Sequence, residues 1–209
     1  MENKKREKLV KICGLTCLED INYINEAKPD FVGFVLFYPK SKRNLELEFA
    51  KELKSKLNKN IKTVGVTVEP SLEEVEKISQ AGFDYVQIHG KIEANILREK
   101  LIPIIKAFNV KDLDEFGFYE KNDAIAGFVL DASVPGSGKS FDWNIVSNLP
   151  ESEKMILLAG GLNPENVKEA LEITMLDGAD TSSGVERENG NGKDQNKIME
   201  FIKNAKNYK

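Results

Sequence analysis

Two side chains of this sequence could exchange protons with a substrate, and each stands at the end of an apolar run. Cys13 ends the run Leu9–Cys13, and Asp131 follows the run Ala124–Leu130. A thiol near a cation such as Lys11 can act as a base. A half-buried carboxyl that keeps its proton can act as a general acid. Position alone leaves two alternatives open, a small buried cysteine and a solvated aspartate in a turn.

Two small-residue loops could bind a phosphate group. Gly160 and Gly161 follow one apolar run, and Ser182, Ser183 and Gly184 follow the next. Glycine lets backbone N–H groups approach an anion closely. Each loop alone would also fit an ordinary glycine turn, but the pair on successive units predicts a phosphate site.

Three further residues are candidates for contact with a substrate. Arg43 ends the basic cluster Lys40–Arg43, and a guanidinium can hold a carboxylate with two parallel hydrogen bonds. The lone histidine, His89, ends the sequence VQIHG and fits a binding or packing role better than catalysis. Asp180 precedes the serine-rich loop.

The stretch Gly136–Ser140 resembles the end of a nucleotide-binding P-loop because it finishes in Gly-Lys-Ser. That motif requires a glycine five positions before the glycine of its Gly-Lys pair, and Ser133 occupies this position. A flexible loop beside the active site is the better interpretation, and a plain surface loop is the alternative.

These candidates stand between buried strands and amphipathic helices. Eight short apolar runs, mostly without alternation, are typical of parallel strands buried on both faces. These runs are Leu9–Cys13, Phe31–Leu36, Thr63–Val68, Tyr85–Ile88, Ile102–Phe108, Ala124–Leu130, Met155–Leu158 and Leu176–Thr181. Charged segments of helical length separate them, including Leu18–Ala27, Leu45–Leu57, one from Ser71, one from Pro164, and Lys193–Ala205.

Eight similar strand–helix units favour an α/β (β/α)₈ TIM barrel over the alternative, an open doubly wound sheet. We expect one domain at 9–209 and a flexible extension at 1–8. In such a barrel the active site lies at the C-terminal ends of the strands. The candidate residues above stand at those ends, and the irregular stretches Asp131–Asp142 and Ser183–Gly192 would lie on the same face.

Composition limits the choice of partners. The chain has 209 residues, a net charge of −4, two cysteines and one histidine. These values argue against nucleic acid as a partner and against a zinc site. We expect no metal or other cofactor. A charged N-terminus and the absence of an apolar run of about 20 residues favour a cytoplasmic protein without a membrane partner.

Six motifs in the same order resemble the phosphoribosylanthranilate isomerase family. They are KICGLT at 11–16, YPKSKR at 38–43, VQIHG at 86–90, PGSGKSFDW at 135–143, GGLNPENV at 160–167 and SSGVE at 182–186. Together they span nearly the whole chain. The sequence departs from the family pattern at Thr67, Glu69, Ala159 and Thr181.

The resemblance implies a ring-opening aldose–ketose isomerisation, an Amadori rearrangement, in tryptophan biosynthesis. It assigns Cys13 as the general base and Asp131 as the general acid. Arg43 would hold the anthranilate carboxylate, and His89 and Asp180 would contact the substrate. Gly160, Gly161, Ser182, Ser183 and Gly184 would bind the phosphate of the sugar. The expected oligomeric state is a monomer or a homodimer.

Three rivals fit the sequence less well. An isomerase of histidine biosynthesis would be expected to carry an aspartate in place of Cys13. A ribulose-phosphate epimerase would need metal-binding histidines, and only His89 is present. A catalytically silent, phosphate-binding barrel would not need both Cys13 and Asp131.

Overall fold

The structure is a computed structural model that describes residues 7–109, 113–131, 143, 146 and 152–206. The Gly-Lys-Ser sequence and the predicted loop that follows Asp131 lie outside the described residues.

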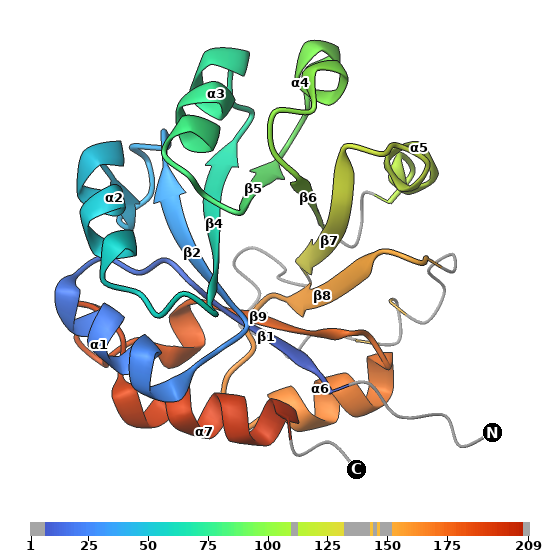
Figure 1. The fold of residues 1–209 in the computed structure, drawn as a ribbon. Coiled ribbons are helices and arrows are strands. Elements are labelled where there is room, and N and C mark those ends of the chain that lie inside the picture. Colours follow the sequence, from blue (N-terminus) through green and yellow to red (C-terminus); the bar gives the residue numbers. More distant parts are fainter. Residues whose placement is uncertain (1–6, 110–112, 132–142, 144–145, 147–151, 207–209) are drawn as a thin grey trace.

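Parallel strands form a closed barrel, which confirms the predicted fold (Figure 1). The first strand pairs with both the second and the last strand, and these two pairings close the sheet. The strands are β1 Leu9–Cys13, β2 Phe31–Leu36, β3 Asn44–Leu45, β4 Lys62–Val68, β5 Tyr85–His89, β6 Ile104–Asn109, β7 Ile125–Asp131, β8 Met155–Ala159 and β9 Gly178–Thr181. All except β3 belong to the closed barrel.

Helices surround the barrel on its outer side (Figure 1). The described helices are α1 Leu18–Ala27, α2 Leu47–Ser55, α3 Leu72–Gln80, α4 Ala94–Glu99, α5 Phe116–Glu120, α6 Val167–Thr174, the short 3₁₀ helix η2 Ser183–Val185, and α7 Gln195–Lys206. None of these described helices is long and apolar enough to span a membrane.

The ranges predicted for the eight barrel strands and for α1, α2 and α7, and the predicted start of α3, agree with the structure to within two residues. Helices α4 and α5 were not assigned from the sequence, and there are two further differences. The two-residue strand β3 was not expected, and it pairs only with the end of β2. Helix α6 begins at Val167, so the prediction of a start at Pro164 is wrong. The reason is a turn in which the backbone N–H groups of Asn163 and Asn166 donate to each other's side chains, at 2.8 and 2.9 Å.

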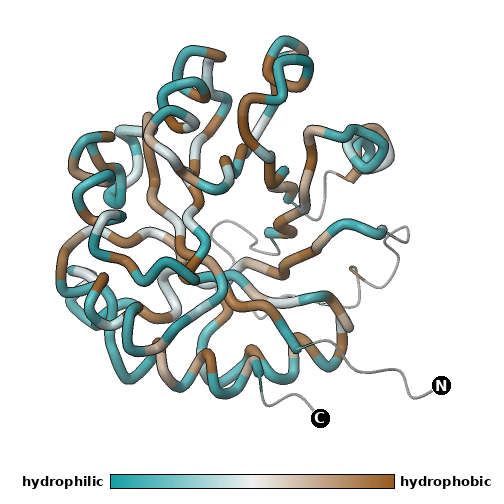
Figure 2. Tube along the Cα trace, viewed as in Figure 1, coloured by the Kyte–Doolittle hydropathy of each residue, from teal (hydrophilic) through white to brown (hydrophobic). Residues whose placement is uncertain are grey.

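The core has an inner and an outer layer. Inside the barrel pack Phe31, Val64, Val66, Ile105, Ala107, Val129, Leu157 and Ala159. Alternate strand residues face outward and pack with the apolar faces of the helices. In Figure 2 the strands at the centre are largely hydrophobic, and hydrophilic stretches lie on the surrounding helices. A filled barrel of this kind leaves space for a ligand only at its rim.

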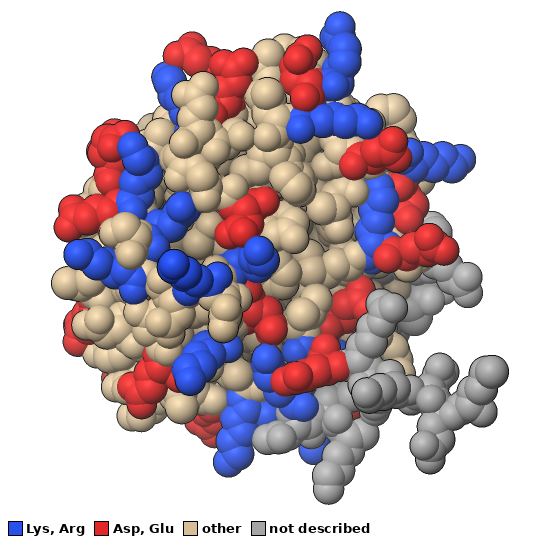
Figure 3. Space-filling view, in the orientation of Figure 1, with Lys and Arg blue, Asp and Glu red and all other residues tan. Residues whose placement is uncertain are grey.

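Charge is distributed rather than clustered on the face of the molecule seen in Figure 3. There, Lys and Arg side chains lie among Asp and Glu side chains. Exposed ion pairs between neighbouring turns of one helix include Lys51 with Glu48 and Lys77 with Glu73. Exposed pairs of this type contribute little to stability.

Candidate active site

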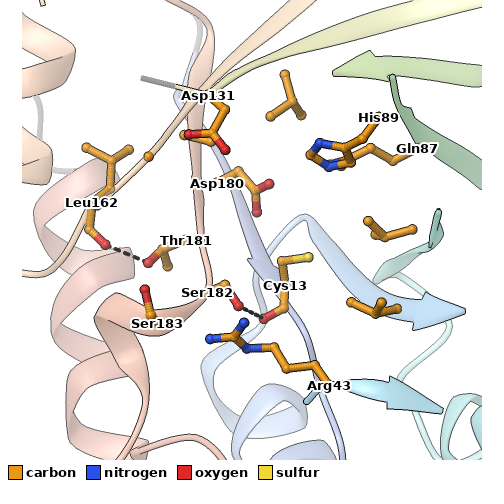
Figure 4. Close-up of a pocket in the computed structure, with 16 residues that line it drawn as sticks. Cys13, Arg43, Gln87, His89, Asp131, Leu162, Asp180, Thr181, Ser182 and Ser183 are labelled. Carbon is orange, nitrogen blue, oxygen red and sulfur yellow. Dashed lines mark hydrogen bonds between the residues drawn. The ribbon is translucent and has the colours of Figure 1, made fainter. Parts of the chain in front are cut away.

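A cavity of about 320 Å³ opens at the C-terminal ends of the strands (Figure 4). Nine of the ten predicted site residues line it: Cys13, Arg43, His89, Asp131, Gly160, Gly161, Asp180, Ser182 and Ser183. The fold therefore brings together side chains from β1, β5, β7 and β9 and from three loops. This is the face of the barrel on which the sequence predicted a site.

Cys13 and Asp131 point into this cavity from different strands. Cys13 is the last residue of β1, and Asp131 is the last residue of β7. In Figure 4 the thiol and the Asp131 carboxyl extend toward the same space, and the side chain of Asp180 lies between them. A ligand in the cavity could therefore contact a thiol and a carboxyl group at the same time.

A buried ion pair lies beneath the thiol. Lys11 and Asp180 are opposite residues on the adjacent strands β1 and β9, and their side chains meet at 2.9 Å. The Lys11 side chain has no solvent exposure. Burial disfavours its charge, but the carboxylate of Asp180 and the nearby Cys13 outweigh this effect and raise the pKa of Lys11. Lys11 therefore supplies a fixed positive charge close to Cys13.

The opposite side of the cavity carries a neutral imidazole. Burial, together with the positive charge of Lys11, lowers the pKa of His89 to about 4, although Asp131 opposes the shift. The ring nitrogen Nε2 of His89 lies 2.9 Å from the side-chain nitrogen of Gln87. An uncharged ring that accepts this hydrogen bond would carry its proton on Nδ1. The side-chain oxygen of Gln87 is buried without a hydrogen-bond partner.

Hydrogen bonds connect the serine-rich loop to β1. The Ser182 hydroxyl donates to the carbonyl of Cys13 at 3.0 Å (Figure 4). The buried ammonium of Lys193 donates to the Ser182 carbonyl, also at 3.0 Å. The Thr181 hydroxyl donates to the carbonyl of Leu162 at 2.6 Å, which joins this loop to the glycine loop. The ends of β1, β8 and β9 are thus held together by side chains.

The glycines of the two loops have different roles. Gly160 and Gly161 line the cavity with positive φ angles of 97° and 69°, which favour glycine. Gly161 has open space where a Cβ would point. Gly184 is not among the residues that line the cavity. A Cβ at this position would lie 1.9 Å from the carbonyl oxygen of Leu162. Gly184 is thus required for the close approach of the two loops.

Arg43 enters the cavity from the loop after β2. Its Nε donates to the carboxylate of Glu186 at 2.5 Å. The aliphatic part of the side chain passes so close to Gly14 that a Cβ on Gly14 would lie 2.4 Å from Cδ of Arg43. The carboxylate of Glu186 therefore holds the guanidinium at Nε, and the backbone of Gly14 restricts the aliphatic part of the side chain.

The chain belongs to a known family. Residues 10–204 match the family model described as N-(5'phosphoribosyl)anthranilate (PRA) isomerase. The chain is a member of the N-(5'-phosphoribosyl)anthranilate isomerase family. It is 41% identical over 204 residues to the N-(5'-phosphoribosyl)anthranilate isomerase of Aquifex aeolicus, a match that covers 94% of this chain and 98% of the relative.

Solved structures of the isomerase family share the fold. The phosphoribosyl anthranilate isomerase of Thermotoga maritima has a TM-score of 0.83 and 37% identity, and the match covers 95% of this chain and 98% of that one. A phosphoribosyl anthranilate isomerase in complex with reduced 1-(o-carboxyphenylamino)-1-deoxyribulose 5-phosphate has a TM-score of 0.81 and 36% identity, with the same coverage. The family predicted from the sequence motifs is confirmed, and the protein is an enzyme.

Two residues behind the isomerase site, Glu186 and Lys193, were not among the sequence candidates, whereas Gln87 stood with His89 among the polar residues at strand ends. Gln87 precedes His89 by two positions, so strand alternation places both side chains on the inner face of β5. Glu186 and Lys193 lie behind Arg43 and Ser182. Among the described residues no group of three or more His, Cys, Asp or Glu side chains is arranged to hold a metal ion.

Proposed function

We propose that this enzyme converts N-(5-phosphoribosyl)anthranilate to 1-(2-carboxyphenylamino)-1-deoxyribulose 5-phosphate in tryptophan biosynthesis. The main support is the convergence of Cys13 and Asp131 on one cavity, which also contains a guanidinium and two glycine- or serine-rich loops. This set of groups matches a substrate with a carboxylate at one end, a phosphate at the other and a sugar between them.

In the proposed mechanism Asp131 is the general acid and Cys13 is the general base. Asp131 donates its proton to the furanose ring oxygen, and the C1–O bond breaks to give a protonated Schiff base. The cationic nitrogen acidifies the proton on C2, which the Cys13 thiolate removes to give an enolamine. The enolamine then gains a proton at C1 and loses its hydroxyl proton at C2, so the product is a ketose. The protons balance, and we expect no metal or other cofactor to be required.

Two buried lysines, Lys11 and Lys193, lie close enough to Cys13 to interact with it electrostatically. The presence of Cys13 favours the charged form of Lys11 and also that of Lys193, although burial lowers the pKa of Lys193 overall. Both ammonium groups therefore face the position where charge must develop when the thiol acts as a base.

Substrate binding would involve the remaining candidates. Backbone N–H groups at Gly160, Gly161, Ser182 and Ser183 would bind the phosphate, with Gly184 supporting the loop. Arg43 would hold the anthranilate carboxylate. Asp180 and His89 would contact the sugar or its nitrogen from opposite sides of the cavity.

A fluorescence assay tests this proposal directly. The purified protein should consume phosphoribosylanthranilate, seen as loss of substrate fluorescence, without added metal or nucleotide. Because proton transfer by a positioned group contributes about 10² to 10⁴ in rate, Cys13→Ser and Asp131→Asn should each lower kcat by a factor in that range. Unchanged activity in both variants would refute the assigned roles.

A third variant, Cys13→Ala, separates the enzyme from a silent binding protein. Cys13→Ala removes the base but leaves the phosphate loops intact, so an unreactive product analogue should still bind with an affinity close to that of the wild type. If the wild-type protein binds this analogue but does not turn over the substrate, it is a silent binding protein and not an enzyme. The cytoplasmic location and a monomeric or homodimeric state remain predictions.

A further inference from the structure

A single buried carboxylate behind the active site is surrounded by three cations. Glu186 is 9% exposed, and its oxygens lie 2.5 Å from Nε of Arg43, 3.0 Å from Nζ of Lys42 and 3.6 Å from Nζ of Lys193. Burial alone would raise the pKa of Glu186. The hydrogen bonds from Arg43 and Lys42 and the charge of Lys193 outweigh it and lower the pKa, so Glu186 is ionised at neutral pH.

The backbone around Glu186 is fixed by a short hairpin. Glu186 and Lys193 form an antiparallel bridge at its base. The Asp194 N–H donates to the Val185 carbonyl at 2.8 Å, and the Lys193 N–H donates to the Asp20 side chain in α1 at 2.7 Å. The carboxylate therefore approaches Arg43 from a rigid support and not from a freely moving loop.

This carboxylate contacts one edge of Arg43 and leaves the other available. The hydrogen bond to Glu186 uses Nε, and the two terminal nitrogens of the guanidinium lie on the side of Ser182 and Ser183 (Figure 4). Gly14 restricts the stem of the same side chain from the opposite side. Arginine loses substantial rotamer entropy when it is immobilised, so a guanidinium held in place before binding captures a carboxylate with a smaller entropic cost.

We propose that Glu186 is a positioning residue that fixes the Arg43 guanidinium for the carboxylate of the substrate, and that Lys193 balances its charge. The inference deepens the proposed function and rests on it. Lys193 also donates to the Ser182 carbonyl, and the Ser182 hydroxyl bonds to Cys13. The ion pair of Glu186 and Lys193 thus connects the carboxylate-binding side of the site with the strand that carries the proposed base.

The test is a double-mutant cycle with Glu186→Gln and Arg43→Ala. In the wild-type background Glu186→Gln should raise KM for phosphoribosylanthranilate about tenfold, with kcat changed less than about threefold, because one ordered side chain is released. In the Arg43→Ala background the same substitution should change KM less than about twofold, since there is no guanidinium left to position.

Matched variants distinguish positioning from a general structural role. Glu188 lies on the same hairpin but is exposed, and Glu188→Gln should leave KM and kcat at wild-type values. If Glu186→Gln fails to fold, Glu186→Asp keeps a negative charge on the hairpin but withdraws it from Nε of Arg43, and KM should rise in the same way.

Three results would overturn the inference. An equal rise in KM in both backgrounds would show that Glu186 does not act through Arg43. A lower KM in Glu186→Gln would show that Glu186 competes with the substrate for the guanidinium. A wild type with no turnover would refute the proposed function itself, and with it this inference.

Discussion

The two sides of the active-site cavity differ in the charge of their buried polar groups and in the partners that these groups have within the protein. On the side formed by β1, β9 and the hairpin, buried ions occur in contact pairs, such as Lys11 with Asp180 and Lys193 with Glu186, although the second oxygen of Asp180 has no hydrogen-bond partner. On the side formed by β4 and β5, Val66 lies beside the neutral His89 and the amide of Gln87, whose oxygen has no partner.

We infer from this difference that the residues of one side mainly stabilise the fold and that those of the other side mainly bind the ligand. Breaking a buried ion pair leaves an uncompensated charge, so changes on the β1–β9 side should cost folding stability. The buried amide oxygen of Gln87 does not stabilise the empty protein, because an acceptor without a hydrogen bond costs free energy. Changes on the β4–β5 side should therefore affect binding more than folding. Three substitutions test this comparison.

Lys11→Met should have the largest effect. It removes the partner of a buried carboxylate, so we expect the free energy of unfolding at pH 7 to fall by about 3–5 kcal/mol. Urea unfolding followed by circular dichroism measures the loss. The loss should shrink in acid, because protonation of Asp180 removes the uncompensated charge. A loss that is small at pH 7 would remove the distinction between the two sides.

Lys62→Met is the matched control for that experiment. Lys62 also pairs with an aspartate, Asp84, at 3.0 Å, but its side chain is half exposed. Water can solvate Asp84 after the substitution, so the urea midpoint should hardly change.

His89 should produce a smaller effect that depends on pH. Its pKa is about 4 in the folded protein, compared with 6.5 for an unperturbed histidine. Between these values the unfolded chain binds a proton that the folded chain does not. Stability should therefore fall as the pH drops from about 7 to 4 and should not depend on this group at higher pH.

His89→Asn should remove this part of the pH dependence. The difference in urea midpoint between the variant and the wild type, measured from pH 4.5 to 7.5, isolates the histidine from the carboxylates. NMR gives an independent value, because the chain contains a single histidine. An imidazole that titrates near 6.5 in the folded protein would contradict a neutral β4–β5 side.

The sequence was sufficient to predict the barrel because its strands are buried on both faces. A run such as Phe31–Leu36 is apolar at nearly every position, and this pattern does not depend on distant partners. Strand β3 escaped prediction because two residues carry no such pattern. The cavity residues at strand ends followed from the fold rule for barrels, and Cys13 and Asp131 do share the cavity.

The residues behind the site could not be predicted in the same way. Arg43 and Glu186 are 143 positions apart, and the loops that bring them together have no regular pattern. Glu186 belongs to the SSGVE motif, but the motif does not reveal which cation its side chain contacts. Lys193 was assigned only to the start of a helix, whereas the structure buries its ammonium against Ser182.

Gln87→Leu should have the smallest effect on folding. The side-chain oxygen of Gln87 has no partner, and the amide contributes a single hydrogen bond, to His89. Replacing it with an apolar residue of similar size should change the free energy of unfolding by less than about 1 kcal/mol. Gln87 lines the cavity, and we expect its oxygen to accept a hydrogen bond from a hydroxyl or amine of the substrate. We therefore expect KM to rise about fivefold, measured with the fluorescence assay, because a hydrogen bond contributes about 1 kcal/mol. If Gln87→Leu instead loses as much stability as Lys11→Met while KM is unchanged, the β4–β5 side holds the fold together and does not serve the ligand.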